Sequence, residues 1–217
     1  MNDLSLDYFI DENLKLYQKK DCFHFNTDTK FLAQFVHLHS NETILDIGTN
    51  NGALLLYMDQ FNVQKLIGVE ILKEAFEVCK LNEQFIKHPC EFYNEDIRLF
   101  EHEKVDVILC NPPYFPVSKT NPNVILDNRQ LGRIEINLTF KECVESVNRL
   151  LKDNGRFYFV HRCTFLNEIL EVLSLYHFHI KTMQIAYDKK SMQAKSFCME
   201  VIRDSKCQCT ILPVKWI

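Results

Sequence analysis

Val105-Asp-Val-Ile-Leu-Cys110 is a largely apolar run that leads directly into Asn111-Pro-Pro-Tyr-Phe115. The run predicts a buried strand, which must stop at the two prolines because they lack amide hydrogens and have fixed φ angles. The resulting turn is expected to hold the side-chain oxygen of Asn111 beside the carbonyl oxygen of Pro112. Two acceptors that converge on one point suit an exocyclic amino group, which has two hydrogens to donate. Because the aromatic face of Tyr114 also suits the planar ring that carries such an amine, the stretch favours an amine-methylating enzyme.

A second strand is expected over residues 43–48, where Thr-Ile-Leu-Asp-Ile-Gly is apolar enough to be buried and ends in a turn. Four residues of this turn allow tight backbone, namely Gly48, Asn50, Asn51 and Gly52. A helix is expected over residues 53–58, and strand, glycine turn and helix together form the setting of a nucleotide-binding loop, with Asp46 near its start. The second and third glycines of the dinucleotide pattern are absent, which disfavours NAD and FAD. No Gly-Lys-Ser/Thr follows, so the turn is not a P-loop.

Acidic residues follow the next two expected strands. The strand over residues 65–70 ends in Glu70, 22 positions after the first glycine of the turn, about the distance at which an acid reaches ribose hydroxyls. The strand over residues 90–94 is followed by Asp96 and Ile97. In open α/β sheets ligands bind at the carboxyl ends of the strands. These residues are therefore expected to share one site with the glycine turn and the Asn-Pro-Pro-Tyr turn.

The later elements follow from apolar spacing. Three helices are expected, over residues 74–85, 140–151 and 164–176. The second is expected to be closed by Asn154-Gly155, because glycine commonly ends helices, and a strand over residues 156–161 follows. Further apolar runs predict a strand pair with a polar connection near the C-terminus; they cover residues 178–187, 196–203 and 207–212.

The segment before the glycine turn begins with an ambiguous stretch. Asn26-Thr-Asp-Thr29 offers several helix caps in succession, and a helix is expected behind it. Its apolar face consists of Phe31, Leu32, Phe35 and Val36. Thr27 and Asp28 are candidates both for helix caps and for cofactor contacts. Residues 1–25 lack a long periodic pattern, so we expect a solvated arm; the alternative is a segment that faces RNA or covers the cofactor.

Length and composition indicate one α/β domain: the chain has 217 residues, 47% of them hydrophobic and 25% charged. We divide it into an N-terminal arm, residues 1–25, and a Rossmann-like catalytic core, residues 26–217. Nine cysteines without regular spacing and no signal peptide indicate the cytoplasm, and no apolar run is long enough to span a membrane. The net charge of −4 argues against a nonspecific nucleic-acid coat protein but allows a local basic surface. The eight histidines have no metal-ligand spacing, so no metal site is expected.

The order of these pieces resembles that of the class I S-adenosylmethionine-dependent methyltransferases. Asp46-Ile-Gly-Thr-Asn-Asn-Gly52 resembles their glycine loop, and Gly68-Val-Glu70 their ribose-binding acid. Asp96 looks like the residue that accepts a hydrogen bond from the cofactor adenine, and Asn111-Pro-Pro-Tyr114 like the catalytic motif of the amino-methylating branch.

A narrower resemblance is to the bacterial tRNA1(Val) (adenine37-N6)-methyltransferase family. It is carried by Phe23-His-Phe-Asn-Thr-Asp-Thr-Lys-Phe-Leu-Ala33, by Asn-Pro-Pro-Tyr-Phe and by the stretch from Gly132-Arg-Ile-Glu135. In that family the residue before the glutamate is usually a histidine, whereas here it is Ile134.

The resemblance implies a seven-stranded, mostly parallel sheet with one antiparallel strand and helices on both faces. It implies direct methyl transfer from S-adenosylmethionine to N6 of an adenine in the anticodon loop of tRNA, adenine 37 of tRNA1(Val) by likeness to the family. Asn111 and the Pro112 carbonyl would hold the amine, and Tyr114 would stack on the base.

Cofactor contacts are expected from Asp46, Gly48, Asn50, Gly52, Glu70, Asp96, Ile97 and Asn111, with Thr27 and Asp28 as further candidates. Substrate contacts are expected from Pro113, Phe115, Lys119 and Arg133, next to a polar loop over residues 116–130. No metal is required, and we expect a monomer or homodimer.

Other functions fit parts of the pattern. A protein-glutamine N5-methyltransferase of the release-factor type uses the same Asn-Pro-Pro-Tyr turn on an amide. That family carries a helical domain before the glycine loop, whereas only 45 residues precede Asp46 here. A DNA adenine methyltransferase usually adds a target-recognition domain, for which this chain has no room. A catalytically silent, cofactor-binding partner subunit is a third alternative, against which the intact motif counts.

Overall fold

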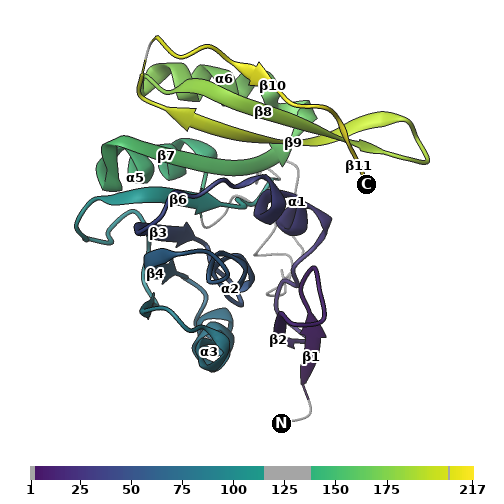
Figure 1. Ribbon diagram of the computed structural model, residues 1–217, viewed down its shortest axis with the longest axis vertical. Coiled ribbons are helices and arrows are strands. Elements are labelled where there is room, and N and C mark those ends of the chain that lie inside the picture. Colours follow the sequence, from purple (N-terminus) through teal and green to yellow (C-terminus); the bar gives the residue numbers. More distant parts are fainter. Residues whose placement is uncertain (1–2, 115–137, 205) are drawn as a thin grey trace, which may run out of the picture.

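A mixed β-sheet forms the centre of the computed structural model, which describes residues 3–114, 138–204 and 206–217 (Figure 1). Its seven main strands are β3 (Glu42–Ile47), β4 (Val63–Val69), β5 (Cys90–Tyr93), β6 (Val105–Cys110), β7 (Leu151–Arg162), β8 (His179–Asp188) and β9 (Gln193–Ile202). Two short strands, β10 (Thr210–Ile211) and β11 (Lys215–Trp216), pair with β8. The main strands lie in the order β8-β9-β7-β6-β3-β4-β5.

The direction of the strands agrees with the sequence-based expectation. Pairing is parallel from β5 through β4, β3 and β6 to β7. β9 runs antiparallel to both of its neighbours, β7 and β8. The prediction of seven mostly parallel strands with one antiparallel strand is therefore confirmed, and β10 and β11 extend the β8 edge in the parallel direction.

Helices cover both faces of the sheet, as predicted (Figure 1). They are α1 (Thr27–Phe35), α2 (Ala53–Met58), α3 (Lys73–Asn82), α5 (Phe140–Leu150) and α6 (Leu166–Leu175), with 3-10 turns at Glu83–Phe85 and Cys163–Phe165. On the central strand β3, Ile44 packs with α1 and α2, while Leu45 and Ile47 pack with α5 and α6. Alternate side chains of this strand thus enter two cores, which explains why it is apolar on both faces. None of the helices in the described residues is long and apolar enough to cross a membrane.

The predicted end of the helix at Asn154-Gly155 is wrong. α5 ends at Leu150, and Leu151 already pairs with Val105 in the sheet. The register then shifts, and Gly155 lies where a Cβ atom would come within 3.0 Å of the Asp106 carbonyl oxygen. This glycine therefore serves the close approach of two strands at a bulge rather than a helix end.

The first residues form a packed hairpin, so the expectation of a solvated arm is also wrong. β1 (Leu4–Tyr8) and β2 (Lys15–Lys19) pair in antiparallel fashion, and Phe9, Leu14 and Leu16 are buried in the core that contains α1 and α2. The inward-facing residues alternate over too short a stretch, and between too many charges, to stand out as a periodic pattern.

Truncation of Leu16 tests this packing. Leu16 is fully buried, so Leu16→Ala should lower the free energy of unfolding by about 2–5 kcal/mol through lost apolar burial and a residual cavity. Leu6 on the partner strand is 43% exposed, and Leu6→Ala is the matched control, with a change of roughly 0.5 kcal/mol or less. Urea unfolding measures both; equally small losses would show that the hairpin does not pack on the core in solution.

Candidate active site

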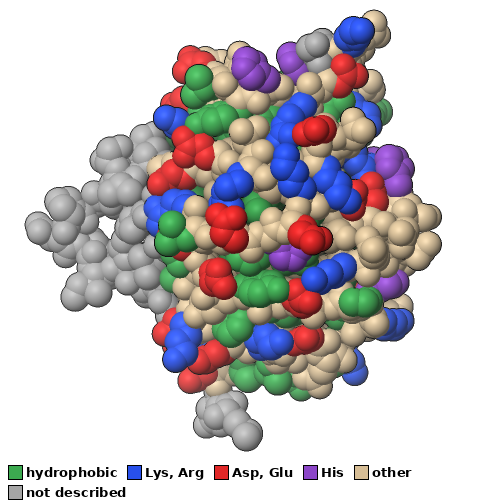
Figure 2. Space-filling model, turned by 90° about the vertical axis from the view of Figure 1, so that its left-hand side faces the viewer, with side chains coloured by type: hydrophobic (Ala, Val, Ile, Leu, Met, Phe, Trp, Pro, Cys, Tyr) green, Lys and Arg blue, Asp and Glu red, His purple; other side chains and the backbone are tan. Residues whose placement is uncertain are grey.

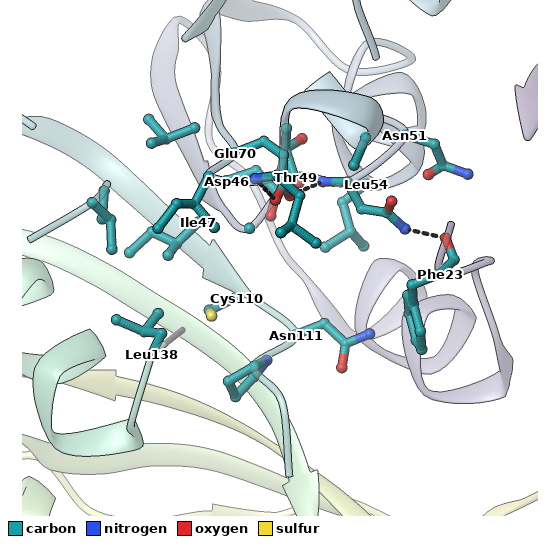
Figure 3. A pocket seen from close by; sticks show the side chains of 18 of the residues that line it. Phe23, Asp46, Ile47, Thr49, Asn51, Leu54, Glu70, Cys110, Asn111 and Leu138 are labelled. Atoms are coloured by element: carbon teal, nitrogen blue, oxygen red, sulfur yellow. Dashed lines mark hydrogen bonds between the residues drawn. The ribbon is translucent and has the colours of Figure 1, made fainter. Parts of the chain in front are cut away.

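One cavity lies at the carboxyl ends of β3, β4 and β6 (Figure 3). Of the site residues predicted from sequence, nine line it: Asp46, Gly48, Asn50, Glu70, Asp96, Ile97, Asn111, Pro112 and Pro113. Gly52, Thr27, Asp28 and Tyr114 do not line it. Phe115, Lys119 and Arg133 lie outside the described residues, as do the loop 116–130 and the stretch 132–135. The structure therefore brings most of the predicted side chains together at one edge of the sheet.

The glycine turn has the tight backbone that its sequence predicts. Gly48, Asn50 and Gly52 all have positive φ angles, of 68°, 52° and 80°. The amides of Gly48 and Thr49 donate to the Val69 carbonyl, at 2.9 and 3.1 Å, so the turn lies across the end of β4. Gly52 begins α2 and packs against the Phe92 ring instead of facing the cavity, so it serves the turn and not a ligand.

Two buried acids face the cavity. Asp46 is 1% exposed, and neither of its carboxylate oxygens has a hydrogen-bond partner among the described residues. Burial raises the pKa of Asp46 to about 8, and nearby Glu70 adds to the shift. Glu70 accepts hydrogen bonds from the amides of Asn50 (2.8 Å) and Leu72 (2.9 Å), which offset part of the rise that burial imposes on its own pKa. A bound cation with hydroxyl donors would stabilise both carboxylates, so the acids favour a positively charged ligand.

Asp96 reaches the cavity but is paired. The Nε atom of Arg98 lies 2.9 Å from both of its carboxylate oxygens, and this bond lowers the pKa of Asp96. Arg98 in turn binds Glu142 in the first turn of α5, at 3.1 Å. Ile97, beside Asp96, lines the cavity while its carbonyl accepts from Arg149. The pairing keeps the Asp96 carboxylate ionised and directs it toward Arg98.

Asn111 is held at both ends of its side chain. Its Nδ2 donates to Thr29 Oγ1 at 3.0 Å, and its Oδ1 accepts from the hydroxyl of Tyr114. The Tyr114 ring is only 7% exposed: its face carries the Arg162 guanidinium, 5.1 Å from the centroid, and His161 meets it edge to face. Arg162 and His161 thus contact the Tyr114 ring, which does not line the cavity, and its stacking on a base stays a prediction.

Thr27 and Asp28 also lie away from the cavity. Thr27 is exposed at the first turn of α1, whose cap is Asn26. Asp28 is buried, accepts from Ser196 at 2.8 Å and pairs with Arg162 at 3.1 Å. Its carboxylate therefore joins α1 to β7 and β9, and neither residue is placed to contact a ligand in this cavity.

Sequence reasoning missed several residues that do line the cavity. They are Cys22, Phe23, Phe25, Thr29, Glu95 and Leu138, among others. The carbonyl of Phe23 accepts from Asn50 Nδ2 at 2.5 Å, which ties the segment after β2 to the glycine turn (Figure 3). The two phenylalanines in Phe23-His-Phe25, just before a capped helix, were the available signal. The alternative expectation, a segment that covers a ligand site, fits this placement.

Figure 2 shows the side of the molecule away from which β6 and β7 run in Figure 1, and there lysines and arginines alternate with acids. Ion pairs near the amino ends of β6 and β7 include Lys152 with Asp106 and Arg203 with Asp153. Within the described residues no group of three or more His, Cys, Asp or Glu side chains could hold a metal ion.

The fold and the cavity together define a class I methyltransferase: a mostly parallel sheet with a glycine turn, an acid and an Asn-Pro-Pro-Tyr turn at one edge. A family model described as a methyltransferase domain matches residues 38–207, and the chain belongs to that family.

Relatives and solved structures agree with this class. A tRNA1(Val) (adenine(37)-N6)-methyltransferase of Bacteroides fragilis is 29% identical over 162 residues, which cover 71% of this chain and 66% of the relative. The chain thus aligns with just under two thirds of that relative's length. An enzyme of the same name from Cytophaga hutchinsonii is 26% identical over 87% of this chain and 80% of its own length. The crystal structure of a ribosomal protein L11 methylase from Lactobacillus delbrueckii subsp. bulgaricus matches with a TM-score of 0.63 at 15% identity, covering 84% of this chain and 82% of that one.

The raised pKa of Asp46 predicts a pH-dependent stability. Between the unfolded pKa near 3.8 and the folded pKa of about 8, the folded state binds more protons, so this residue makes stability fall as pH rises. Asp46→Asn removes that dependence. The free energy of unfolding of the variant, relative to wild type, should therefore increase from pH 5 to pH 8 by at most about 1.4 kcal/mol per pH unit. Urea unfolding at pH 5, 6.5 and 8 checks this, and a constant difference would contradict a raised pKa.

Proposed function

We propose that this protein methylates the exocyclic N6 of an adenine in the anticodon loop of a cytoplasmic tRNA, adenine 37 of tRNA1(Val), with S-adenosylmethionine as donor. The observation that carries the proposal is the position of Asn111 and Pro112, which line the same cavity as the two buried acids. The names of the relatives support adenine in tRNA as the substrate.

The described residues fit this cofactor. S-adenosylmethionine supplies an electrophilic methyl group on a sulfonium, and the molecule is a cation with ribose hydroxyls. Asp46 and Glu70 suit both features, because one is a buried carboxylate without a hydrogen-bond partner and the other is held at the end of β4. We assign the remaining contacts to Gly48, Asn50, Asp96, Ile97 and Asn111, which line the same cavity.

The chain's own contribution to the reaction is positioning. An amide oxygen has two lone pairs, and on Asn111 the Tyr114 hydroxyl uses one of them. The second is left for one hydrogen of the adenine amine, and the Pro112 carbonyl accepts the other hydrogen. With both hydrogens held, the nitrogen lone pair points along the direction of transfer. Such alignment can supply several kcal/mol of the barrier reduction, on the order of 7–11 in the most favourable cases.

The target base has to leave its stack to reach this cavity. Unstacking costs less free energy for a nucleotide in a loop than for a paired one, so an anticodon-loop adenine suits the site. Pro113 lines the cavity next to Pro112 and is the described candidate for contact with the base. Phe115, Lys119 and Arg133 are the further candidates from the sequence.

Replacement of Asn111 tests the proposal. Unmodified bulk tRNA is incubated with labelled S-adenosylmethionine, and the nucleosides are analysed by mass. Wild type should form N6-methyladenosine, and Asn111→Ala should slow its formation at least about a hundredfold, because the amine loses its alignment. Asn167→Ala is the control, since this asparagine is exposed on α6 and outside the cavity.

The other outcomes separate the alternatives. Label in a glutamine of a release factor, with none in RNA, would show that the protein is a protein-glutamine methyltransferase instead. Cofactor binding to wild type, with no transfer to either substrate, would indicate a silent partner subunit.

A further inference from the structure

We propose that Thr29 is a positioning residue that sets which end of the Asn111 carboxamide faces the substrate amine. The inference rests on the proposed amine methylation. Thr29 lies in the first turn of α1, is buried and lines the cavity, and its Oγ1 atom is 3.0 Å from Asn111 Nδ2. An asparagine side chain is nearly symmetric in shape but not in chemistry, because one end accepts hydrogen bonds and the other donates them. A neighbour that can only accept therefore decides its orientation.

The helix cap makes Thr29 an acceptor for Asn111. Asn26 Oδ1 accepts from the Thr29 amide at 3.0 Å, which identifies it as the oxygen of the Asn26 side chain. The Thr29 hydroxyl donates its single hydrogen to this same oxygen, at 3.3 Å. Its lone pairs receive the Asn26 amide, at 3.2 Å, and Asn111 Nδ2. With its hydrogen committed to the cap, Thr29 presents only a lone pair to Asn111.

The other end of the carboxamide agrees with this orientation. The Tyr114 hydroxyl donates to Asn111 Oδ1, and the ring is fixed by Arg162 and His161. A carboxamide turned by 180° would have to take the Thr29 hydrogen away from Asn26. The buried Tyr114 hydroxyl would then meet an NH2 group and would lose the acceptor to which it now donates. The observed orientation satisfies Thr29, Asn111 and Tyr114 together, and the turned one breaks two of these hydrogen bonds.

The orientation matters for the reaction because the NH2 end of a carboxamide only donates hydrogen bonds and cannot accept one from the substrate amine. A flipped Asn111 would present hydrogens to the hydrogens of the adenine N6, so that molecules in the flipped state would not align the nucleophile. Loss of the Thr29 hydroxyl should therefore reduce the productive fraction of the enzyme, which lowers the rate without weakening cofactor binding. A threonine that only capped the helix would instead affect stability.

Three variants separate positioning from capping. Thr29→Val keeps the shape and removes the hydroxyl, and should lower kcat for tRNA about tenfold or more, as expected for one lost hydrogen bond, with the Kd for S-adenosylmethionine within about twofold. Thr29→Ser should restore most of kcat. Thr139→Val is the matched control: Thr139 forms the same kind of capping box at the start of α5 and does not line this cavity, so its loss should lower Tm without lowering kcat.

A second readout does not depend on RNA. In ¹⁵N–¹H spectra of the whole protein, the side-chain NH2 pair of Asn111 is identified by its absence in Asn111→Asp. In Thr29→Val this pair should shift and broaden as the carboxamide samples two orientations, and Thr29→Ser should return it to the wild-type position. If Thr29→Val does not fold, Asn26→Ala provides the same test, because it removes the acceptor that commits the Thr29 hydrogen, while Asn26→Asp retains it.

The two readouts distinguish the possible failures. An unchanged Asn111 signal together with an unchanged kcat in Thr29→Val would overturn the role of Thr29. If Thr29→Val lowered Tm as much as Thr139→Val does, and this loss of stability accounted for its whole loss of rate, Thr29 would be only a helix cap. If wild type fails to methylate tRNA, the proposed function fails, and the spectra still decide whether Thr29 orients Asn111.

Discussion

The site depends on the parallel pairing of β3 with β4 on one side and β6 on the other. This register sets Asp46 opposite Gly68 and Leu109, so the three strands end at the same level of the sheet. Residues that follow them must emerge at a single edge. The glycine turn, Glu70 and Asn111 therefore meet one cavity although the chain between them is long. Gly68 is part of this constraint, because a Cβ atom there would come within 2.9 Å of the Thr49 side chain in the turn.

A chain of buried amides then attaches the N-terminal hairpin to the same edge. Gln18 Oε1 accepts from Asn51 Nδ2 at 3.1 Å and from the Phe25 amide at 3.0 Å. Asn82 Nδ2 donates to the carbonyls of Asn51 and Tyr17, at 2.8 and 2.9 Å. These bonds join β2, the glycine turn and α3, and each would leave a buried polar group unpaired if broken. The hairpin is therefore part of the cavity's structure, and the segment that follows it closes one side of the site.

The cavity has two chemically different halves. Asp46 and Glu70 make one half acidic; their burial raises the pKa of both carboxyls, and such a pair favours a cationic ligand. The other half contains Asn111 and Pro112, which accept hydrogen bonds without carrying charge. In the proposed reaction the affinity for the methyl donor therefore depends on the ionisation of the two acids. The alignment of the amine does not depend on it, because Asn111 and Pro112 do not titrate.

The sequence by itself determined where the strands end and which chemistry follows them. An apolar run closed by Gly48 or by Pro112 depends on local backbone freedom, so these turns could be predicted without knowing what packs around them. The orientation of the Tyr114 side chain could not be predicted in this way. It depends on Arg162, which lies over the ring and pairs with Asp28, and both residues are distant in the chain. The docking of the hairpin on α3 and the glycine turn, the bulge at Gly155 and the contact between Thr29 and Asn111 likewise join residues far apart in the chain. Local pattern decides where a strand stops; only tertiary packing decides what the side chains beyond it touch.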